Sequence, residues 1–443
     1  MIIQPPNTNL IINADCLTAL KELPDNSVDS IVTDPPYGLS FMGKKWDYEV
    51  PSIEIWKECL RVLKPGGYLL SFSGTRTYHR ICIGIEDAGF EIRDMISWLY
   101  GSGFPKSFNV AKGIEGTILR GNSNTTEFRK LKGETQRIVN GYTKMENEQG
   151  NKPRNYNDRN GESVIKPEFE TEEAKQYEGF GTALKPACEP IVVARKPLSE
   201  KNVALNCLNW GTGGINIDGC RVGTEEHRVN VNDFSNQHGN KFGNNMPIQK
   251  LGERMVTGRF PANIILDEEA GKILDEQTLG KVGNGHWAKT KVTGFGEFGN
   301  GKSEYFGVGE KDKEKGGASR FFYCAKASKS ERNLGCEELD ESNVDYGERM
   351  GQNNSKIRPD GTERKSNIQK NNHPTVKPIK LMQYLVRLVT PKGGICLDPF
   401  LGSGTTACAC IKEGMNYIGI EREEDYVKIA NARIKAVEDS QQN

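Results

Sequence analysis

A carboxylate, two prolines and an aromatic ring directly follow one apolar run of the sequence. The motif Asp34-Pro35-Pro36-Tyr37 comes after residues 30–33, which are typical of a buried strand. The lone pair of an exocyclic amine on a nucleobase is delocalised into the ring, so a site that alkylates this nitrogen needs acceptors for both amino hydrogens. The Asp34 carboxylate can supply one acceptor and the backbone carbonyl of Pro35 the other, and Tyr37 offers a flat face for an extruded base. Taken alone, these residues also fit an ordinary strand-to-turn junction.

A second motif combines a carboxylate with closely spaced glycines, again directly after a predicted strand. It runs from Asp398 to Thr406 and reads Asp-Pro-Phe-Leu-Gly-Ser-Gly-Thr-Thr. Glycines at such a junction let a ligand approach the backbone at a helix N-terminus. No lysine follows Gly404, which disfavours a triphosphate-binding loop, and the acidic residue at the start of the turn would suit the cationic end of S-adenosylmethionine. The next strand ends about twenty residues further on in Glu421, where a carboxylate can bind ribose hydroxyls, so a nucleoside cofactor is expected.

Strands and helices alternate at both ends of the chain, which predicts a mostly parallel sheet covered by helices on both faces. In such a sheet, ligands gather at the carboxyl ends of the strands, where both motifs would then lie. The predicted strands are residues 9–12, 28–33, 68–72, 90–100, 189–196, 395–397 and 416–421. The predicted helices begin at Cys16 and Thr406 or span residues 53–63, 79–88, 379–389 and 425–437.

With both motifs in this order, the sequence resembles the β-class N6-adenine/N4-cytosine site-specific DNA methyltransferases of bacteria and prophages, in which the catalytic motif precedes the cofactor motif. The resemblance covers the two ordered ends of the chain and the strand at 189–196. It implies an α/β, Rossmann-like S-adenosylmethionine-dependent methyltransferase fold that is circularly permuted. The sheet would be mostly parallel and seven-stranded with one antiparallel edge strand, and polar insertions would serve target recognition.

The resemblance also implies roles for individual residues. Asp34, Pro35, Pro36 and Tyr37 would form the catalytic loop. S-adenosyl-L-methionine would be the cofactor, with Asp15 against its adenine and Glu421 on its ribose. Thr375 and Lys377 would hold the methionine carboxylate. The remaining contacts to the methionine part would come from the glycine motif, namely Asp398, Pro399, Phe400, Gly402, Gly404 and Thr405.

Long polar segments separate the ordered regions. Basic residues outnumber acidic ones between positions 104 and 160, and residues 225–372 are rich in Gly, Asn, Lys and Glu. This composition fits long loops or partial disorder, and it is also compatible with a surface that becomes ordered on DNA. Lys130 and Lys132 are candidate phosphate contacts. By resemblance, Phe104 and Lys106 would border the target base, with a plain surface turn as the alternative.

Composition limits the other classes of function. The 443 residues carry a formal net charge of 0, so any basic surface that meets DNA must be local. The sequence shows no signal segment and no apolar run near the roughly 20 residues of a bilayer span, which predicts a cytoplasmic, nucleoid-associated protein with no membrane contact. The 11 cysteines include no CxxC pair and the five histidines are dispersed, so we expect no metal site.

We therefore expect methyl transfer to N6 of a flipped adenine in duplex DNA, within a specific short sequence. Transfer to N4 of cytosine is the alternative, since both amines need the same acceptors; Asp rather than Ser at position 34 favours adenine as a family tendency. RNA or protein-glutamine methylation is less favoured because those enzymes carry Asn where this chain has Asp34. A non-catalytic DNA-binding protein is disfavoured by the intact motifs. Double-stranded DNA is the expected partner, and the family admits a homodimer and a cognate restriction endonuclease.

The predicted organisation places the methyltransferase domain in three separate segments: 1–103 (catalytic half), 183–224 (edge strand and connection) and 373–438 (cofactor-binding half). Between them lie two polar insertions, 104–182 (basic insert contacting DNA) and 225–372 (target recognition), and residues 439–443 would form a disordered tail.

Overall fold

The protein is described by a computed structural model. It describes residues 8–39, 47–101, 103, 107–120, 138–139, 142–143, 169, 171–232, 250–278, 318–325, 329–337, 339, 342–343, 368–369, 371, 373 and 375–442. Two compact units are present, and they are described separately. The first comprises Met1–Gly101, Cys188–Asp345 and Lys356–Asn443, and the second comprises Ser102–Ala187 and Tyr346–Ser355.

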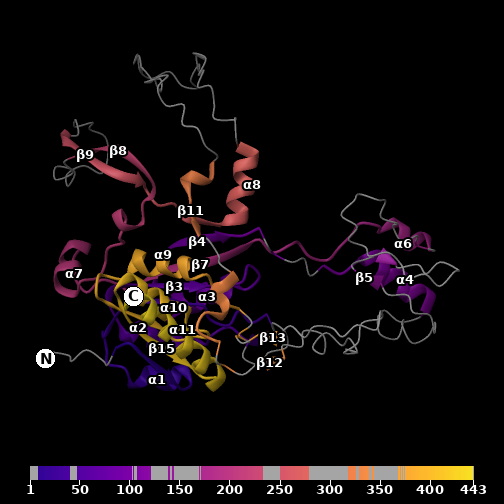
Figure 1. Cartoon of the computed structure of the whole chain (residues 1–443), viewed down its shortest axis with the longest axis horizontal. Helices are drawn as coiled ribbons and strands as arrows, with labels where there is room; N and C mark the ends of the chain where they lie inside the picture. The colour runs from indigo at the N-terminus through magenta and orange to yellow at the C-terminus, as the bar shows by residue number, and fades with distance from the viewer. Residues whose placement is uncertain are drawn as a thin grey trace, which may run out of the picture. The chain divides into compact units, whose positions relative to one another are not determined.

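A sheet forms the centre of the first unit (Figure 1). Its nine strands have the order β1-β15-β14-β2-β3-β7-β4-β10-β11. Every neighbouring pair is parallel except the two pairs made by β7, which runs antiparallel to β3 and β4. The bounds are β1 Leu10–Asn13, β15 Asn416–Glu421, β14 Ile395–Asp398, β2 Val28–Thr33, β3 Leu63–Phe72, β7 Cys188–Arg195, β4 Glu91–Leu99, β10 Ile264–Asp267 and β11 Tyr323–Ala325.

This sheet confirms the α/β class and the mostly parallel arrangement, and it corrects two details. The sheet has nine strands in the described part of the chain instead of seven. The antiparallel strand is not at an edge, because the sheet continues past β7 through β4, β10 and β11. The two additional strands come from residues 264–267 and 323–325, inside the segment expected to serve target recognition.

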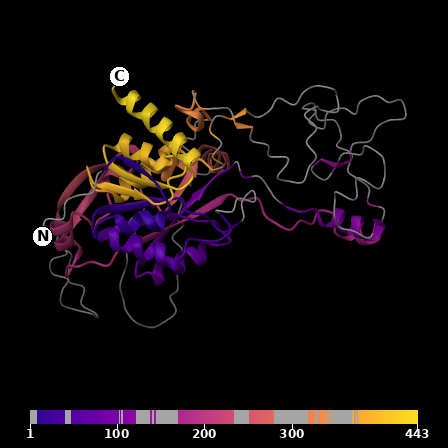
Figure 2. The ribbon, with the colours of Figure 1, turned by 90° about the horizontal axis from the view of Figure 1, so that it is seen from below.

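Alternating side chains of the central strands divide the core into two layers. Tyr68, Leu70 and Phe72 of β3 belong to one hydrophobic cluster, while Leu69 belongs to the other, as the two-residue period of a strand requires. The first cluster packs against α9, α10 and α11 and the second against α1, α2 and α3, and Figure 2 shows these groups on opposite sides of the sheet. All six residues of β2 are buried between them.

The six covering helices lie close to their expected positions. Their bounds are α1 Cys16–Glu22, α2 Ile53–Val62, α3 Tyr78–Asp87, α9 Ile379–Val389, α10 Thr405–Glu413 and α11 Glu424–Gln442. Helix α2 ends one residue before the expected position because Leu63 already belongs to β3. Helix α11 continues to Gln442, so residues 439–442, which were expected to be a disordered tail, extend the last helix.

Further elements of the first unit lie in segments whose composition is polar. They are α7 Val203–Trp210, the 3-10 turns η3 Asp218–Cys220, η4 Ala318–Phe321 and η5 Lys329–Asn333, the hairpin β8 Val222–Asn232 and β9 Lys250–Arg259, α8 Glu268–Thr278, and the short pair β12 Ser342–Asn343 and β13 Ile368–Gln369. No helix among the described residues has the length and apolar character needed to span a bilayer.

The second unit contains α4 Val110–Arg120, α6 Glu172–Gln176 and a short antiparallel pair, β5 Ile138–Val139 and β6 Tyr142–Thr143. Thr171 caps α6 and its hydroxyl donates to the carboxylate of Glu115 in α4 over 2.7 Å, which joins the two helices. The four predicted DNA contacts, Phe104, Lys106, Lys130 and Lys132, lie outside the described residues.

Candidate active site

The two motifs meet because the strands that precede them are neighbours. In the parallel pair β2–β14, Ser30 lies opposite Cys396 and Ile31 opposite Leu397, so both strands end at the same edge. Just beyond these paired residues, the Thr33 hydroxyl donates to Asp398 Oδ1 over 2.6 Å. A single hydrogen bond therefore joins the strand end that carries Asp34 to the residue that begins the glycine loop.

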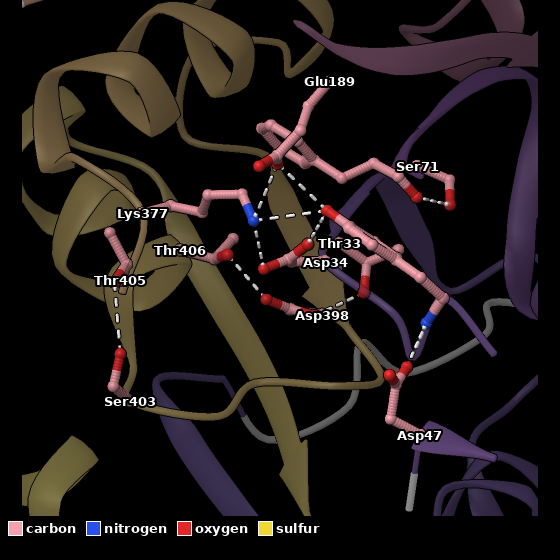
Figure 3. A network of polar contacts seen from close by, with 12 residues as sticks. Thr33, Asp34, Asp47, Ser71, Glu189, Lys377, Asp398, Ser403, Thr405 and Thr406 are labelled. Carbon is pink, nitrogen blue, oxygen red and sulfur yellow. Dashed lines mark hydrogen bonds and ion pairs between the residues drawn. The ribbon is translucent and has the colours of Figure 1, made fainter. Parts of the chain in front are cut away.

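Both carboxylate oxygens of Asp34 accept hydrogen bonds (Figure 3). The Tyr37 hydroxyl donates to Oδ1 over 2.6 Å, and the Lys377 ammonium donates to Oδ2 over 2.6 Å. Lys377 lies just before α9, so the chain segment that precedes β14 places a cation on the expected catalytic carboxylate. The Lys377 nitrogen also lies 4.9 Å from the centre of the Phe72 ring, close enough for a cation–π contact.

Glu189 is a second carboxylate in this cluster, and the sequence analysis did not identify it. Its Oε2 accepts from the Tyr37 hydroxyl over 3.2 Å and lies 3.2 Å from the Lys377 nitrogen (Figure 3). Because β7 runs antiparallel, its first residues lie at the edge where the parallel strands end. Glu189 is the first residue of the strand predicted at 189–196. Because that strand was expected to be antiparallel, its first residue could have been predicted to lie at this edge.

Burial and the two carboxylates determine the charge states of the cluster. Burial raises the pKa of Tyr37 well above its usual value, and the negative charges of Asp34 and Glu189 raise it further. Burial acts to lower the pKa of Lys377, but the charges of Asp34 and Glu189 outweigh it and hold that pKa above its usual value. At neutral pH, Tyr37 is therefore a neutral donor and Lys377 a cation.

Asp47 holds the turn that carries Tyr37, and it is a second residue that the sequence analysis missed. Its Oδ1 accepts from the backbone nitrogens of Tyr37 over 2.7 Å and Gly38 over 3.0 Å. The Asp47 side chain is buried, but it lies in a stretch of sequence with no strand or helix periodicity, so nothing in the pattern distinguished it from an exposed acidic residue.

Asp398 organises the start of the glycine loop. Its Oδ1 accepts from Thr33 and, over 3.1 Å, from the backbone nitrogen of Phe400, while Oδ2 accepts from the Thr406 hydroxyl over 2.5 Å. Burial raises the pKa of Asp398 to about 6 even though these donors favour the charged form. The carboxylate is thus charged at neutral pH and holds the loop against the end of β2.

Glu421, at the end of β15, closes the other side of the loop. Its Oε2 accepts from the Gly402 nitrogen over 2.8 Å and its Oε1 from the Glu423 nitrogen over 2.8 Å. Burial raises the pKa of Glu421 above its usual value. The carboxylate predicted to bind ribose therefore also fixes the first glycine of the loop.

The two glycines of the loop have backbone conformations that other residues rarely adopt. Gly402 has φ +54° and Gly404 has φ +79°. A Cβ added at Gly402 would lie 2.7 Å from His373 Nε2, and one added at Gly404 would lie 2.9 Å from the Cβ of Ala430 in α11. Both glycines are therefore required by backbone angle and by close packing.

Arg433 of α11 is hydrogen-bonded to the glycine loop, a role that was not predicted from the sequence. It is fully buried, and one terminal nitrogen donates to the Ser403 carbonyl over 2.6 Å, the Ser403 hydroxyl over 2.9 Å and the Thr405 hydroxyl over 2.9 Å. Burial lowers its pKa below the usual arginine value. From the sequence alone, an arginine on the last helix is expected to face solvent, so nothing marked Arg433 as a buried residue.

The remaining predicted residues lie around the same edge. Asp15 follows β1, caps α1 and accepts from the Thr18 nitrogen over 3.2 Å, while Asn13 of β1 pairs in register with Glu421. Pro35, Pro36, Pro399 and Phe400 lie in the two loops, and Thr375 precedes Lys377 by two positions. The carboxylates that contact Lys377 are Asp34 and Glu189. The described residues contain no group of three or more acidic, histidine or cysteine side chains placed to hold a metal.

Comparison with known proteins agrees with these motifs. A family model of the N6/N4 type, described as DNA methylase, matches residues 28–432. The Type II methyltransferase M.BglI of Bacillus subtilis is 44% identical over 69 residues, which are 15% of this chain and 20% of that protein. The Type II methyltransferase M.ScaI of Streptomyces caespitosus is 38% identical over 73 residues, 16% of this chain and 24% of that protein.

The matched part spans only about a fifth to a quarter of the length of these curated relatives. Among solved structures, the PvuII DNA methyltransferase (cytosine-N4-specific) aligns over 98% of this chain and 92% of its own at 13% identity, with a TM-score of 0.39. At that score the likeness adds nothing to the strand order described above. The family match, in contrast, covers both the Asp34 motif and the Asp398 loop and most of the residues between them, and on that ground this chain belongs to the N6/N4 DNA methylase family.

Proposed function

We propose that this protein transfers a methyl group from S-adenosylmethionine to N6 of an adenine extruded from duplex DNA, within a specific short sequence. The observation that carries the proposal is the hydrogen bond from Thr33 to Asp398, which joins the Asp34 motif directly to the glycine loop. Methyl transfer needs the acceptor amine and the methyl donor side by side, and this junction supplies one site for each.

The glycine loop fits the proposed cofactor. Gly402 and Gly404 let the loop turn tightly and pack directly against His373 and Ala430, where any Cβ would collide. The cofactor is proposed to lie along this loop. Glu421 ends β15 and Asp15 follows the end of the adjacent strand β1, where a nucleoside would meet carboxylates, and Asp398 and Phe400 begin the loop. S-adenosylmethionine, when bound, would supply an electrophilic methyl group attached to sulfonium.

The chain's own residues would prepare the amine. Asp34 and the Pro35 carbonyl would accept its two hydrogens, which draws the nitrogen lone pair out of the ring. Tyr37, neutral because of its raised pKa, would donate to Asp34 and present its ring to the base. Lys377 would leave Asp34 and, with Thr375, hold the methionine carboxylate when the base enters.

Adenine N6 is proposed over cytosine N4 because position 34 is Asp and not Ser. Cytosine N4 is the second candidate, since its amine needs the same two acceptors. The relatives M.BglI and M.ScaI are Type II methyltransferases, which supports action at a specific DNA sequence and a cognate restriction endonuclease as partner. The polar segments 104–182 and 225–372, with Phe104, Lys106, Lys130 and Lys132, are proposed to contact DNA, and such a substrate places the protein at the nucleoid.

Expression in a methylation-free bacterial host, followed by single-molecule sequencing of the host genome, tests this proposal. N6-methyladenine at one recurring motif is expected, and N4-methylcytosine would correct the base while keeping the mechanism. An Asp34→Ala variant should leave the genome unmodified while binding S-adenosylmethionine within a few-fold of wild type by calorimetry. An unmodified genome with soluble, cofactor-binding wild-type protein would overturn duplex host DNA as the substrate.

A further inference from the structure

We infer that Glu189 is a second base-binding carboxylate, which faces the target amine together with Asp34. This inference rests on the proposed function and adds a residue to that site. Glu189 is placed there by the antiparallel direction of β7, which brings its second residue to the edge where the Asp34 motif and the glycine loop lie.

The position of the Lys377 nitrogen locates a point that both carboxylates can reach. That nitrogen lies 2.6 Å from Asp34 Oδ2, 3.2 Å from Glu189 Oε2 and 3.2 Å from the Tyr37 hydroxyl. A nitrogen with several hydrogens therefore finds two carboxylate acceptors at one place (Figure 3). An exocyclic amine presents two hydrogens, so the ammonium marks where the amine would lie, with one hydrogen toward Asp34 and the second shared between the Pro35 carbonyl and Glu189.

Accessibility distinguishes the two carboxylates from the lysine. The side chains of Asp34 and Glu189 are 20% and 22% exposed, whereas that of Lys377 is 9% exposed. A base entering from solvent would therefore meet the carboxylates, with the lysine behind them. Glu189 and Asp34 are positioned to receive the incoming amine once Lys377 has withdrawn.

The charge of the cluster suits the chemistry of the reacting nitrogen. The amine nitrogen forms a bond to the methyl carbon as the bond from that carbon to sulfur breaks and the sulfur keeps the electron pair. The nitrogen then carries a positive charge until one of its protons passes to a carboxylate and on to solvent. Two carboxylates around one point stabilise this developing charge, and Glu189 offers a proton acceptor in addition to Asp34.

A purely structural role for Glu189 is the alternative, in which it only fixes Lys377. Combining a variant of Glu189 with a change of the target base separates the two roles, because a purely structural residue would affect the affinity for either base equally. DNA affinity is measured for wild type and Glu189→Gln with adenine or purine, which lacks the amino group, at the target position of the motif found by sequencing. S-adenosylhomocysteine is present so that no transfer occurs.

The expected result is that Glu189→Gln lowers the single-turnover rate of methyl transfer by about tenfold to a hundredfold, the range for loss of one charge-assisted hydrogen bond. Glu189→Asp should retain part of the rate. Binding of adenine DNA should weaken while binding of purine DNA stays unchanged, and calorimetric affinity for S-adenosylmethionine should stay within twofold. Glu58→Gln is the matched control, since Glu58 is 21% exposed and its partner Arg61 keeps a second carboxylate, Asp25.

Equal weakening with adenine and purine, or a Glu189→Gln rate equal to wild type, would overturn the role of Glu189 while leaving the proposed function intact. Failure of the wild-type protein to methylate any DNA would instead overturn the proposed function, and the role of Glu189 with it. If Glu189→Gln does not fold, as judged by its melting curve, the comparison is made with Glu189→Asp, whose transfer rate must still fall below wild type.

Discussion

Replacing Gly404 by alanine should cost more stability than the same change at Gly414, although both glycines are left-handed. Gly404 has φ +79° and Gly414 has φ +68°, and this conformation costs alanine about 1–2 kcal/mol at either site. At Gly414 nothing lies within 4 Å of the new Cβ. At Gly404 the new Cβ would lie 2.9 Å from the Ala430 Cβ and 3.0 Å from its Cα.

The second contact involves helix backbone, which cannot rotate away as a flexible side chain can. Overpacking of this kind adds about 1–3 kcal/mol. We therefore expect Gly404→Ala to lower the free energy of unfolding by about 2–5 kcal/mol and Gly414→Ala by about 1–2 kcal/mol. Gly404→Ala should also weaken cofactor binding, because α11 and the loop must separate.

Urea unfolding of the two variants measures this difference from the shift in the midpoint concentration, provided that the dependence of the unfolding free energy on urea is the same in both. The variant Ala430→Gly removes one of the two close atoms, so in the double variant with Gly404→Ala the cost should be less than the sum of the single costs. Equal destabilisation by Gly404→Ala and Gly414→Ala, or strict additivity with Ala430→Gly, would refute the role of packing against α11.

Three other predictions concern buried polar groups around the loop. Burial lowers the pKa of His373 to about 4, so this histidine binds a proton more tightly in the unfolded chain than in the folded protein. The free energy of unfolding, measured by urea titration, should therefore rise by about 3 kcal/mol between pH 4 and 6.5. In His373→Gln this rise should be smaller. Burial raises the pKa of Asp398 to about 6, so the affinity for the cofactor, measured by calorimetry, should fall as the pH drops below 6, and the affinity of Asp398→Asn should not change with pH. The contribution of Asp398 to folding stability has the opposite sign: it is present below the ordinary pKa of 3.8 and is lost as the pH rises through 6. Arg433→Met removes the donors to Ser403 and Thr405 and should weaken cofactor binding about tenfold, more than Arg433→Lys does, and unchanged affinity would contradict the supporting role.

Much of the site could be predicted because its motifs lie directly after strands with strong apolar patterns. Asp34 follows β2 and Asp398 is the last residue of β14. Both strands are buried throughout, and their parallel pairing places both carboxylates at one edge. The position of a residue at the end of a buried parallel strand is thus determined by local pattern and topology together.

The remainder depends on tertiary contacts that leave little trace in local pattern. Strands β10 and β11 have only 4 and 3 residues; β10 forms by pairing with the edge of β4, and β11 by pairing with β10. Glu189 and Arg433 are charged residues, and charged residues usually face solvent. Their positions at the site follow from the antiparallel direction of β7 and the packing of α11 against the loop, neither of which has a sequence period of its own.

The strand order has a consequence for how this protein is made. β1 and β2 are successive in the chain, but β15 and β14, from the far end of the sequence, lie between them in the sheet. A ribosome must therefore synthesise nearly the whole chain before β1 acquires any neighbour in this sheet, and contacts of such long range slow folding. A nascent or truncated chain that lacks β14 has Asp34 without the loop beside it, so incomplete copies would carry no active site.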